Sequence, residues 1–66
     1  MLEYIDIKSR IIEWMYNIHS FTAPELRDML NSVFEGTQRK AAYRIVREID
    51  ENRFIRRNPD GSFTYI

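Results

Sequence analysis

The chain of 66 residues contains no cysteine, a single histidine and only two glycines. Without cysteine, neither a disulfide nor a thiolate metal site can form, and His19 has no second histidine with which to share a metal. Gly36 and Gly61 stand far apart, so the chain has no glycine-rich phosphate-binding loop. We therefore expect no catalytic residues, no metal site and no cofactor, and no site for a small-molecule ligand is evident.

Long hydrophobic runs are also missing. No stretch approaches the roughly 18 uninterrupted apolar residues of a membrane span, and Glu3 and Asp6 interrupt the start of the chain, unlike a signal peptide. The formal net charge is +0, which argues against an unselective binder of polyanions. We expect no membrane association and a cytoplasmic location.

The composition is that of one folded domain over residues 1–66, with 44% hydrophobic and 14% aromatic residues. Because the sequence starts with Met1, we expect a complete small protein. Charge is distributed unevenly: residues 1–36 carry three basic side chains against six acidic ones, whereas residues 37–57 carry seven against three. This asymmetry predicts a basic surface on one side of the fold.

Apolar residues at helical spacing predict a first helix over residues 3–19. They cover roughly half of its circumference, so we expect it to be packed from two directions. Either it is a central helix within the monomer, or one stripe, anchored by Trp14, contacts a second copy or a partner protein. The stripes are Ile7, Ile11, Trp14 and Ile18 on one side and Ile5, Ile12 and Tyr16 on the other, and the candidate partner surface is Trp14, Ile5, Ile12 and Tyr16.

A strong start signal precedes the second helix, which we expect over residues 23–35. Thr22 is a favourable N-cap, and Glu25 stands three residues later, which is the spacing of a capping box. Gly36 is a natural stop for this helix, and Thr37 follows as the expected N-cap of the next. The two helices are therefore predicted to form a tight helix–turn–helix.

The third helix, over residues 38–52, has two different faces. Its apolar stripe predicts a core side, and Asn52 is expected to end it in the left-handed conformation. On the opposite side, basic and aromatic residues recur at i, i+3, i+4 and i+7. The core stripe is Ala42, Ile45, Val46 and Ile49, and the outer face carries Lys40, Tyr43, Arg44 and Arg47.

Residues 53–66 predict a β-hairpin as the last element. Two short strand-like runs flank residues 58–61, whose Asn-Pro-Asp-Gly sequence is typical of a tight turn. The predicted fold is therefore mainly α with a small β-hairpin, in the order α-α-α-β-β.

This order resembles a winged helix-turn-helix DNA-binding domain of the small bacterial, archaeal, plasmid or phage regulator type. The segment FTAPELRDML looks like the second helix of that family, and TQRKAAYRIVREIDENRFIRR looks like its recognition helix running into the wing. Ala42, Val46 and Ile49 match the family's core positions on that helix, and Ile55 matches the aliphatic residue that starts the wing.

The resemblance implies sequence-specific binding of double-stranded DNA by a small transcriptional regulator, nucleoid-associated in the cell. Helix 38–52 would enter the major groove and the 53–66 hairpin would be the wing. Gln38 and either Arg39 or Arg44 are expected to read bases, and Lys40, Tyr43 and Arg47 to contact phosphates. Thr37 would offer backbone N–H groups to a phosphate at the helix start, and the wing would supply Arg56 and Arg57.

Two other interpretations compete with DNA binding. The basic face of helix 38–52 would be an ordinary solvated surface if Arg44–Glu48 and Arg47–Glu51 formed i, i+4 ion pairs. Winged-helix domains also act as protein–protein interaction modules, which would use the apolar surface of helix 3–19. Binding of single-stranded nucleic acid is a weaker third interpretation because few aromatics are expected to be exposed.

Overall fold

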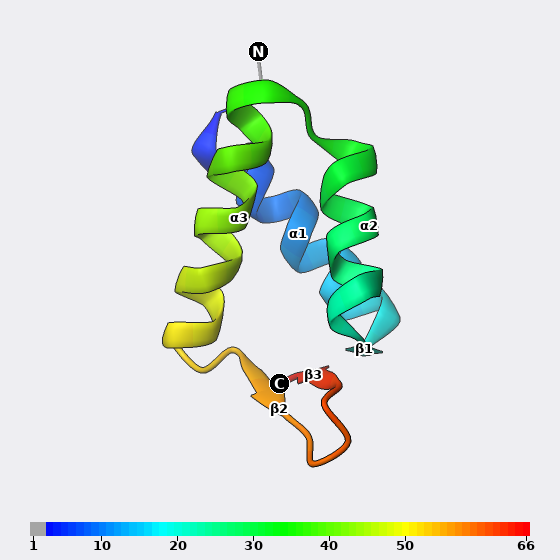
Figure 1. The fold of residues 1–66 in the computed structure, drawn as a ribbon. Helices are drawn as coiled ribbons and strands as arrows, with labels where there is room; N and C mark the ends of the chain where they lie inside the picture. The colour runs from blue at the N-terminus through cyan, green and yellow to red at the C-terminus, as the bar shows by residue number, and fades with distance from the viewer. Residues whose placement is uncertain (1–2) are drawn as a thin grey trace.

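Three helices surround the core, and a small antiparallel sheet closes one end of it (Figure 1). The computed structural model describes residues 3–66. α1 lies behind α2 and α3 in this view, and the architecture is compatible with a winged-helix fold. The elements are α1 (Tyr4–Ile18), β1 (Ser20–Phe21), α2 (Ala23–Val33), α3 (Gly36–Glu51), β2 (Ile55–Arg57) and β3 (Phe63–Tyr65).

The buried core draws on every helix and on two of the strands, and all its side chains are hydrophobic. Ala42, Ile45 and Ile49 are buried as predicted, whereas Val46 is only half-buried. No polar or charged side chain is buried among residues 3–66, so the core imposes no desolvation cost on an ionised group. The buried set is Ile7, Ile11, Met15, Phe21, Leu30, Phe34, Ala42, Ile45, Ile49 and Ile55.

The sheet has three strands, so the predicted α-α-α-β-β order is wrong in omitting β1. The strand order is β1-β3-β2, with Phe21 opposite Phe63 and Ser20 opposite Thr64. A strand of two residues is too short to show the alternation by which strands are found in a sequence. Its partner β3 lies at the far end of the chain, so only the tertiary fold reveals the pairing.

The capping box at the start of α2 is confirmed. The Glu25 N–H donates to Thr22 Oγ1 at 3.3 Å, and the Thr22 N–H donates to Glu25 Oε1 at 2.8 Å. The helix ends at Val33 rather than at residue 35, because Phe34 adopts an extended backbone and turns into the core.

The α2–α3 junction also differs in its cap. Glu35, not Thr37, occupies the N-cap position of α3, and Gly36 is the first residue of the helix with φ of +56°. Glycine adopts a left-handed φ without the steric cost of a Cβ, so Gly36 suits the conformation of this junction.

The end of α3 corrects a second expectation. Asn52 has φ of −85°, and the left-handed residue is Arg53, with φ of +63°. The Asn52 side chain instead donates from Nδ2 to the Glu48 carbonyl oxygen at 2.9 Å, so it caps the helix through its amide group. The first helix, α1, stops at Ile18, one residue before the predicted limit. His19 follows as its C-cap residue, with φ of 67°.

Candidate nucleic-acid interface

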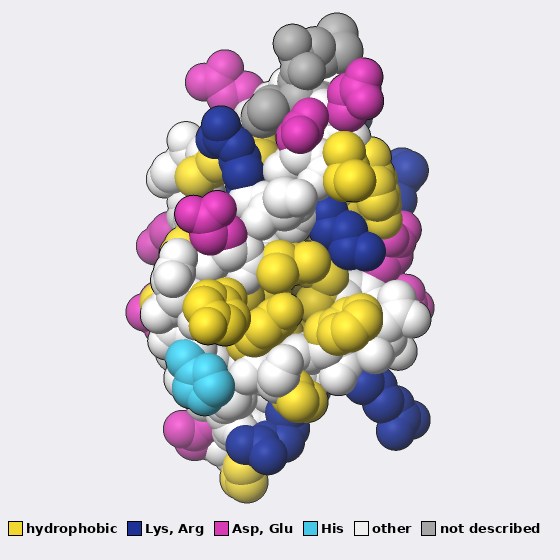
Figure 2. All heavy atoms as spheres, turned by 180° about the vertical axis from the view of Figure 1, so that it is seen from behind, with side chains coloured by type: hydrophobic (Ala, Val, Ile, Leu, Met, Phe, Trp, Pro, Cys, Tyr) yellow, Lys and Arg dark blue, Asp and Glu magenta, His cyan; other side chains and the backbone are white. Residues whose placement is uncertain are grey.

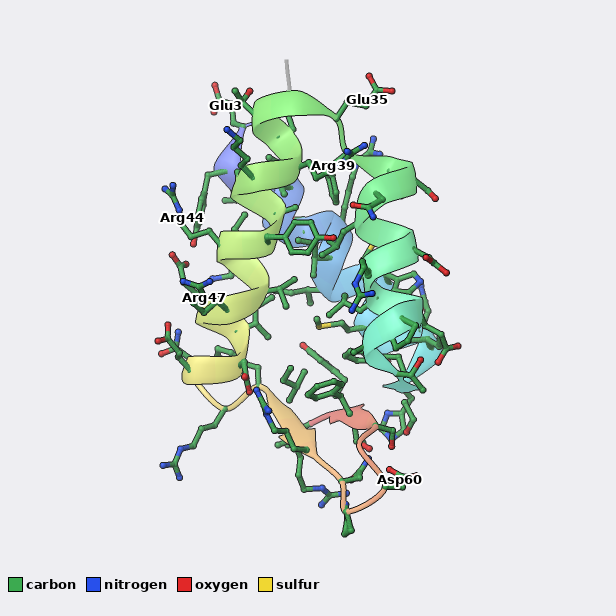
Figure 3. All side chains as sticks on the ribbon, viewed as in Figure 1. Glu3, Glu35, Arg39, Arg44, Arg47 and Asp60 are labelled. Atoms are coloured by element: carbon green, nitrogen blue, oxygen red, sulfur yellow. The ribbon has the colours of Figure 1, made fainter. Side chains whose placement is uncertain are left out.

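The outer face of α3 carries a row of three cations, Lys40, Arg44 and Arg47, which we call the α3 cation row. All three are exposed, and Arg44 and Arg47 project away from α2 (Figure 3). Their position follows from the helical repeat, since Ala42, Ile45 and Ile49 bury the opposite side. Within residues 3–66 none of the three cations makes a side-chain hydrogen bond or an ion pair.

The i, i+4 ion pairs that would neutralise this row do not form. Glu48 accepts a hydrogen bond from the Tyr4 hydroxyl on α1 instead of pairing with Arg44. Across residues 3–66 the one ion pair joins Arg57 to Asp50, with Nη2 and Oδ2 3.0 Å apart. The α3 cation row therefore keeps its charge available for an anionic partner.

The Tyr4–Glu48 contact also affects the tyrosine. The pKa of Tyr4 is raised above its ordinary value, mainly because the neutral phenol donates a hydrogen bond to the Glu48 carboxylate. Partial desolvation and the negative charge of Glu48 act in the same direction. Tyr4 thus stays neutral at physiological pH and links the start of α1 to the C-terminal half of α3.

Arg39 points to a different place from the cation row. Its guanidinium lies between α3 and α2, where Nε donates to the Phe34 carbonyl and Nη2 to the Asn31 carbonyl, both at 3.1 Å (Figure 3). These carbonyls belong to the C-terminal end of α2, which carries no basic residue in its last turn. Arg39 therefore fills the role of a C-terminal cation for α2, and in this conformation it is not available to read a base.

Tyr43 also contacts α2 at this junction, through its hydroxyl group. Its hydroxyl donates to Asn31 Oδ1 at 3.0 Å, and the side chain is 41% exposed. Together, Arg39 and Tyr43 tie α3 to α2 at Asn31, which fixes how the two helices cross. The Tyr43 side chain remains partly exposed, three positions after Lys40 and four before Arg47 of the α3 cation row.

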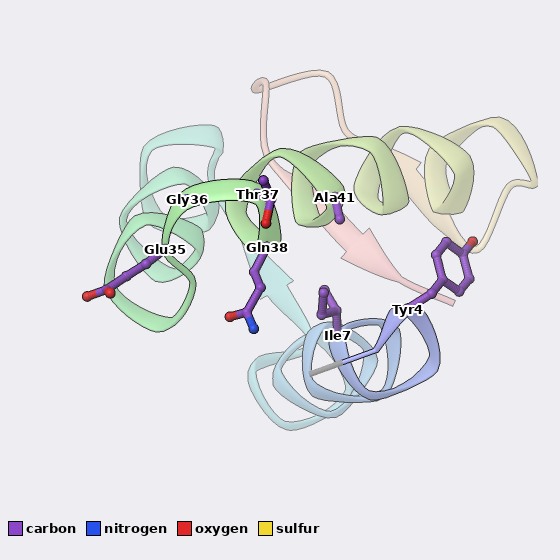
Figure 4. A pocket seen from close by; sticks show the side chains of 7 residues that line it. All are labelled: Tyr4, Ile7, Glu35, Gly36, Thr37, Gln38 and Ala41. Carbon is purple, nitrogen blue, oxygen red and sulfur yellow. The ribbon is translucent and has the colours of Figure 1, made fainter. Parts of the chain in front are cut away.

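Gln38 and Thr37 lie at the N-terminal turn of α3 beside an open hollow between α1 and α3. Gln38 points toward α1 beside Ile7, and Ala41 and Tyr4 also border the hollow (Figure 4). Gln38 therefore leaves the helix on a different side from Arg44 and Arg47. Thr37 is exposed, as a phosphate contact at the start of the helix requires.

The two arginines of β2 lie on opposite faces of the sheet. Arg57 pairs with Asp50, and its guanidinium carbon lies 5.5 Å from the centre of the Phe63 ring. Arg56 is exposed opposite Thr64 and has no ionic partner in the described chain. Arg56 is therefore the freer of the two for contact with a partner.

The loop between β2 and β3 is a tight turn, as the sequence predicts. The Gly61 N–H donates to the Asn58 carbonyl at 3.0 Å, and the Asn58 N–H donates to the Ser62 carbonyl at 2.8 Å. Asp60 accepts hydrogen bonds from the hydroxyl and the backbone N–H of Ser62, and these bonds lower the pKa of its carboxyl. The loop is thus short and carries a negative charge at its tip.

Arg53 is a candidate contact for which the sequence predicts no role beyond its share of the basic charge of residues 37–57. It is exposed, and its positive φ places it in the turn between α3 and β2. The feature of the sequence that could have pointed to Arg53 is its position directly after the end of the third helix, in the connection that leads to Arg56.

The predicted partner surface on α1 is divided by the structure. Trp14 is half-buried and packs on Phe21, with ring centroids 5.1 Å apart, so it belongs to the core side that faces α2. Ile5 and Tyr16 are exposed on the other side of the helix, at 67% and 71%, and Ile12 is half-buried between them. At 100° per residue, position 14 lies opposite positions 5, 12 and 16, so Trp14 cannot anchor the surface they form.

No protein-family model matches the chain, and neither the curated proteins nor the solved structures include a match. None of the three helices has the length and the apolar composition that crossing a bilayer requires, within residues 3–66. The same residues hold no group of three or more histidine or acidic side chains that could bind a metal ion. The candidate site is therefore defined by the geometry of α3 and the sheet.

Proposed function

We propose that the protein binds double-stranded DNA as a small winged helix-turn-helix regulator, with α3 in the major groove. The observation that carries the proposal is the α3 cation row, which faces solvent on one side of a packed helix and lacks carboxylate partners. The major groove is wide enough to admit a helix, and phosphate contacts supply most of the affinity of such complexes.

The fold supports this proposal in a second way. Strand β2 follows α3 after a short turn, so Arg56 on β2 and Arg53 in that turn lie on the segment that leaves the proposed recognition helix. This is where a wing contacts DNA next to the helix. Because the loop tip carries Asp60 rather than a cation, we assign the contact to the arginines at the base of the wing.

The roles of individual residues change from the sequence-based expectation. Arg44 is the base-reading candidate, since a guanidinium matches the two acceptors of guanine, and Lys40 and Arg47 are assigned to phosphates. Arg39 and Tyr43 position α3 through Asn31. Gln38 contacts DNA only if the N-terminal turn of α3, and not its centre, approaches the groove.

The test is fluorescence anisotropy of a labelled random-sequence duplex, titrated with protein at several salt concentrations. Wild-type protein is expected to bind, with log K falling linearly as log salt rises. The double variant Arg44→Ala/Arg47→Ala should bind at least tenfold more weakly, and the magnitude of its salt slope should fall by about 1 for each bound chain, because the phosphate contact of Arg47 is lost.

The matched control is Arg10→Ala/Arg27→Ala, which removes the same charge from exposed positions on α1 and α2. It should keep the wild-type salt slope to within about 0.5 if binding is local to α3. An absence of binding at low salt, or an equal loss in both double variants, would reject the proposed function.

A protein–protein interaction module remains the second candidate, and one observation favours it. The side of α1 that bears Ile5 and Tyr16 is exposed although the residues are large and apolar. Single exposed apolar residues are ordinary, but a contiguous patch marks an interaction surface.

A further inference from the structure

An apolar surface continues from α1 across the end of the sheet. Tyr16 on α1 contacts Tyr65 on β3 edge to face, with ring centroids 6.5 Å apart. Next to Tyr65, the Ile66 N–H donates to the Phe54 carbonyl at 3.0 Å, which brings the residue before β2 to the same place. We call Ile12, Tyr16, Phe54, Tyr65 and Ile66 the apolar face.

Three of these side chains are at least half exposed to solvent although they are large and mostly apolar. Tyr16 and Ile66 are each 71% exposed and Phe54 is 50% exposed, while Ile12 and Tyr65 are half-buried between them. Figure 2, which views the molecule from behind, shows hydrophobic side chains gathered in a band across the middle of this side, with the histidine at its border. The histidine is His19, which borders a hollow with Tyr16, Tyr65 and Ile66.

The side chains at the centre of the apolar face include no acidic or basic residue. The hollow that it borders is lined by Tyr16, Asn17, His19, Tyr65 and Ile66, with no lysine, arginine, aspartate or glutamate. In Figure 2 the charged side chains lie around the hydrophobic band and not within it. In a two-fold symmetric interface each patch meets its own copy, so a charged centre would repel itself and an uncharged one does not.

The area also fits a modest dimer. The exposed parts of Tyr16, Phe54 and Ile66 present on the order of 400 Å² of mostly apolar surface. A standard interface buries about 800 Å² on each partner, with an apolar core inside a polar rim. The apolar face supplies such a core, and neighbouring polar residues such as Asn17 and His19 supply part of the rim.

We propose that the apolar face is a self-association surface, on which a second copy of this chain docks with two-fold symmetry. None of its residues belongs to the α3 cation row, although Phe54 lies next to Arg53, which is assigned to the wing contact. The dimer stands independently of DNA binding. If the proposed function also holds, the dimer presents two α3 helices related by a two-fold axis, which matches the symmetry of a palindromic site.

The test is sedimentation velocity of the full chain without DNA, over concentrations from about 1 to about 500 μM, with light scattering as a second measure of mass. The wild-type chain is expected to shift from the monomer mass to twice that mass within this range. Tyr16→Lys and Ile66→Lys should each raise the dimer dissociation constant at least tenfold, because each places two like charges across the symmetry axis.

Val33→Lys is the matched control, since Val33 is an exposed apolar residue on α2, at 42% exposure, outside the apolar face. It should leave the dissociation constant within twofold of wild type. Circular dichroism establishes that every variant is folded. The proposal is overturned if the wild-type chain stays monomeric throughout, or if Val33→Lys weakens the dimer as much as Tyr16→Lys does.

Two further measurements separate this proposal from DNA binding. Arg44→Ala/Arg47→Ala should dimerise like wild type, and a shift of its dimer constant by tenfold would contradict the assignment of the two surfaces. Tyr16→Lys should still bind the random duplex, with a salt slope about half that of wild type because one copy replaces two.

Discussion

Two arginines five positions apart on α3 have different environments. Arg44 extends into solvent, whereas Arg39 lies against α2 and donates to two main-chain carbonyls there. The last carbonyls of a helix lack intrahelical partners and carry the negative end of its dipole. A guanidinium satisfies two of them at once because its donors are fixed in one plane.

Replacing Arg39 should therefore affect stability more than it affects DNA binding. Arg39→Ala is expected to lower the free energy of unfolding by about 1 kcal/mol, since two charge-assisted hydrogen bonds at a part-buried site are lost. Urea denaturation measures the change. Lys40→Ala, at the adjacent exposed position, should change it by less than about 0.5 kcal/mol.

The DNA-binding measurement should rank Arg39→Ala and Lys40→Ala in the opposite order. Lys40→Ala should reduce the salt slope by about 1 for each bound chain, whereas Arg39→Ala should leave it unchanged once the protein is folded. A stable Arg39→Ala variant with a reduced slope would instead place Arg39 on the DNA.

Asp60 provides a pH-dependent signal from the loop between β2 and β3. Its folded pKa lies below the ordinary value of 3.8, chiefly because the Ser62 hydroxyl donates to the carboxylate, with help from the Ser62 N–H. A lowered folded pKa means that the contribution to stability is complete above the unfolded pKa and is lost as the pH falls through the folded pKa. NMR titration of the Asp60 carboxyl carbon should show this depressed value, and Ser62→Ala should raise it toward 3.8. Ser32→Ala, a distant serine on α2, should leave it unchanged.

At the scale of elements, the start of α2 is set by local chemistry. Thr22 and Glu25 satisfy each other's backbone N–H groups, and Pro24 fits the first turn, where its missing N–H costs little. The helix that follows delivers Leu30 to the core and Asn31 to the contacts with α3.

Removing the cap should weaken the whole domain. Thr22→Ala is expected to lower the free energy of unfolding by about 1 kcal/mol, because the Glu25 N–H loses its acceptor. Thr22→Ser retains the hydroxyl and should recover most of that loss in thermal or urea denaturation. Equal destabilisation by both variants would show that the Thr22 methyl group, and not the capping hydrogen bond, contributes the stability.

At the scale of the whole molecule, a chain of zero net charge separates two kinds of surface. The α3 cation row lies on the outer side of one helix, and the apolar face joins α1 to the sheet. Long-range attraction to DNA depends on local charge and not on the net charge alone, so neutrality is compatible with binding on one side. The acidic residues of 1–36 lie mostly on other elements, which leaves the row unneutralised.

Local interactions could be predicted from the sequence. The capping box, the tight turn at 58–61, the three helices and the buried positions Ala42, Ile45 and Ile49 all depend on residues within one or two helical turns or one loop. Such contacts are fixed by spacing, so a pattern of residue types is enough to predict them.

The tertiary structure alone decided which surfaces are free. The pairing of β1 with β3, the contact of Arg39 with α2 and the hydrogen bond from Tyr4 to Glu48 each join segments that are separate in sequence or turn on the direction of one side chain. Helical spacing placed Arg39 and Arg44 outside the apolar stripe of the third helix. Only the position of α2 showed that Arg39 is hydrogen-bonded to main-chain carbonyls and that Arg44 is exposed. The sequence determined the elements and their caps because those depend on near neighbours, and the packing of the helices determined the candidate site.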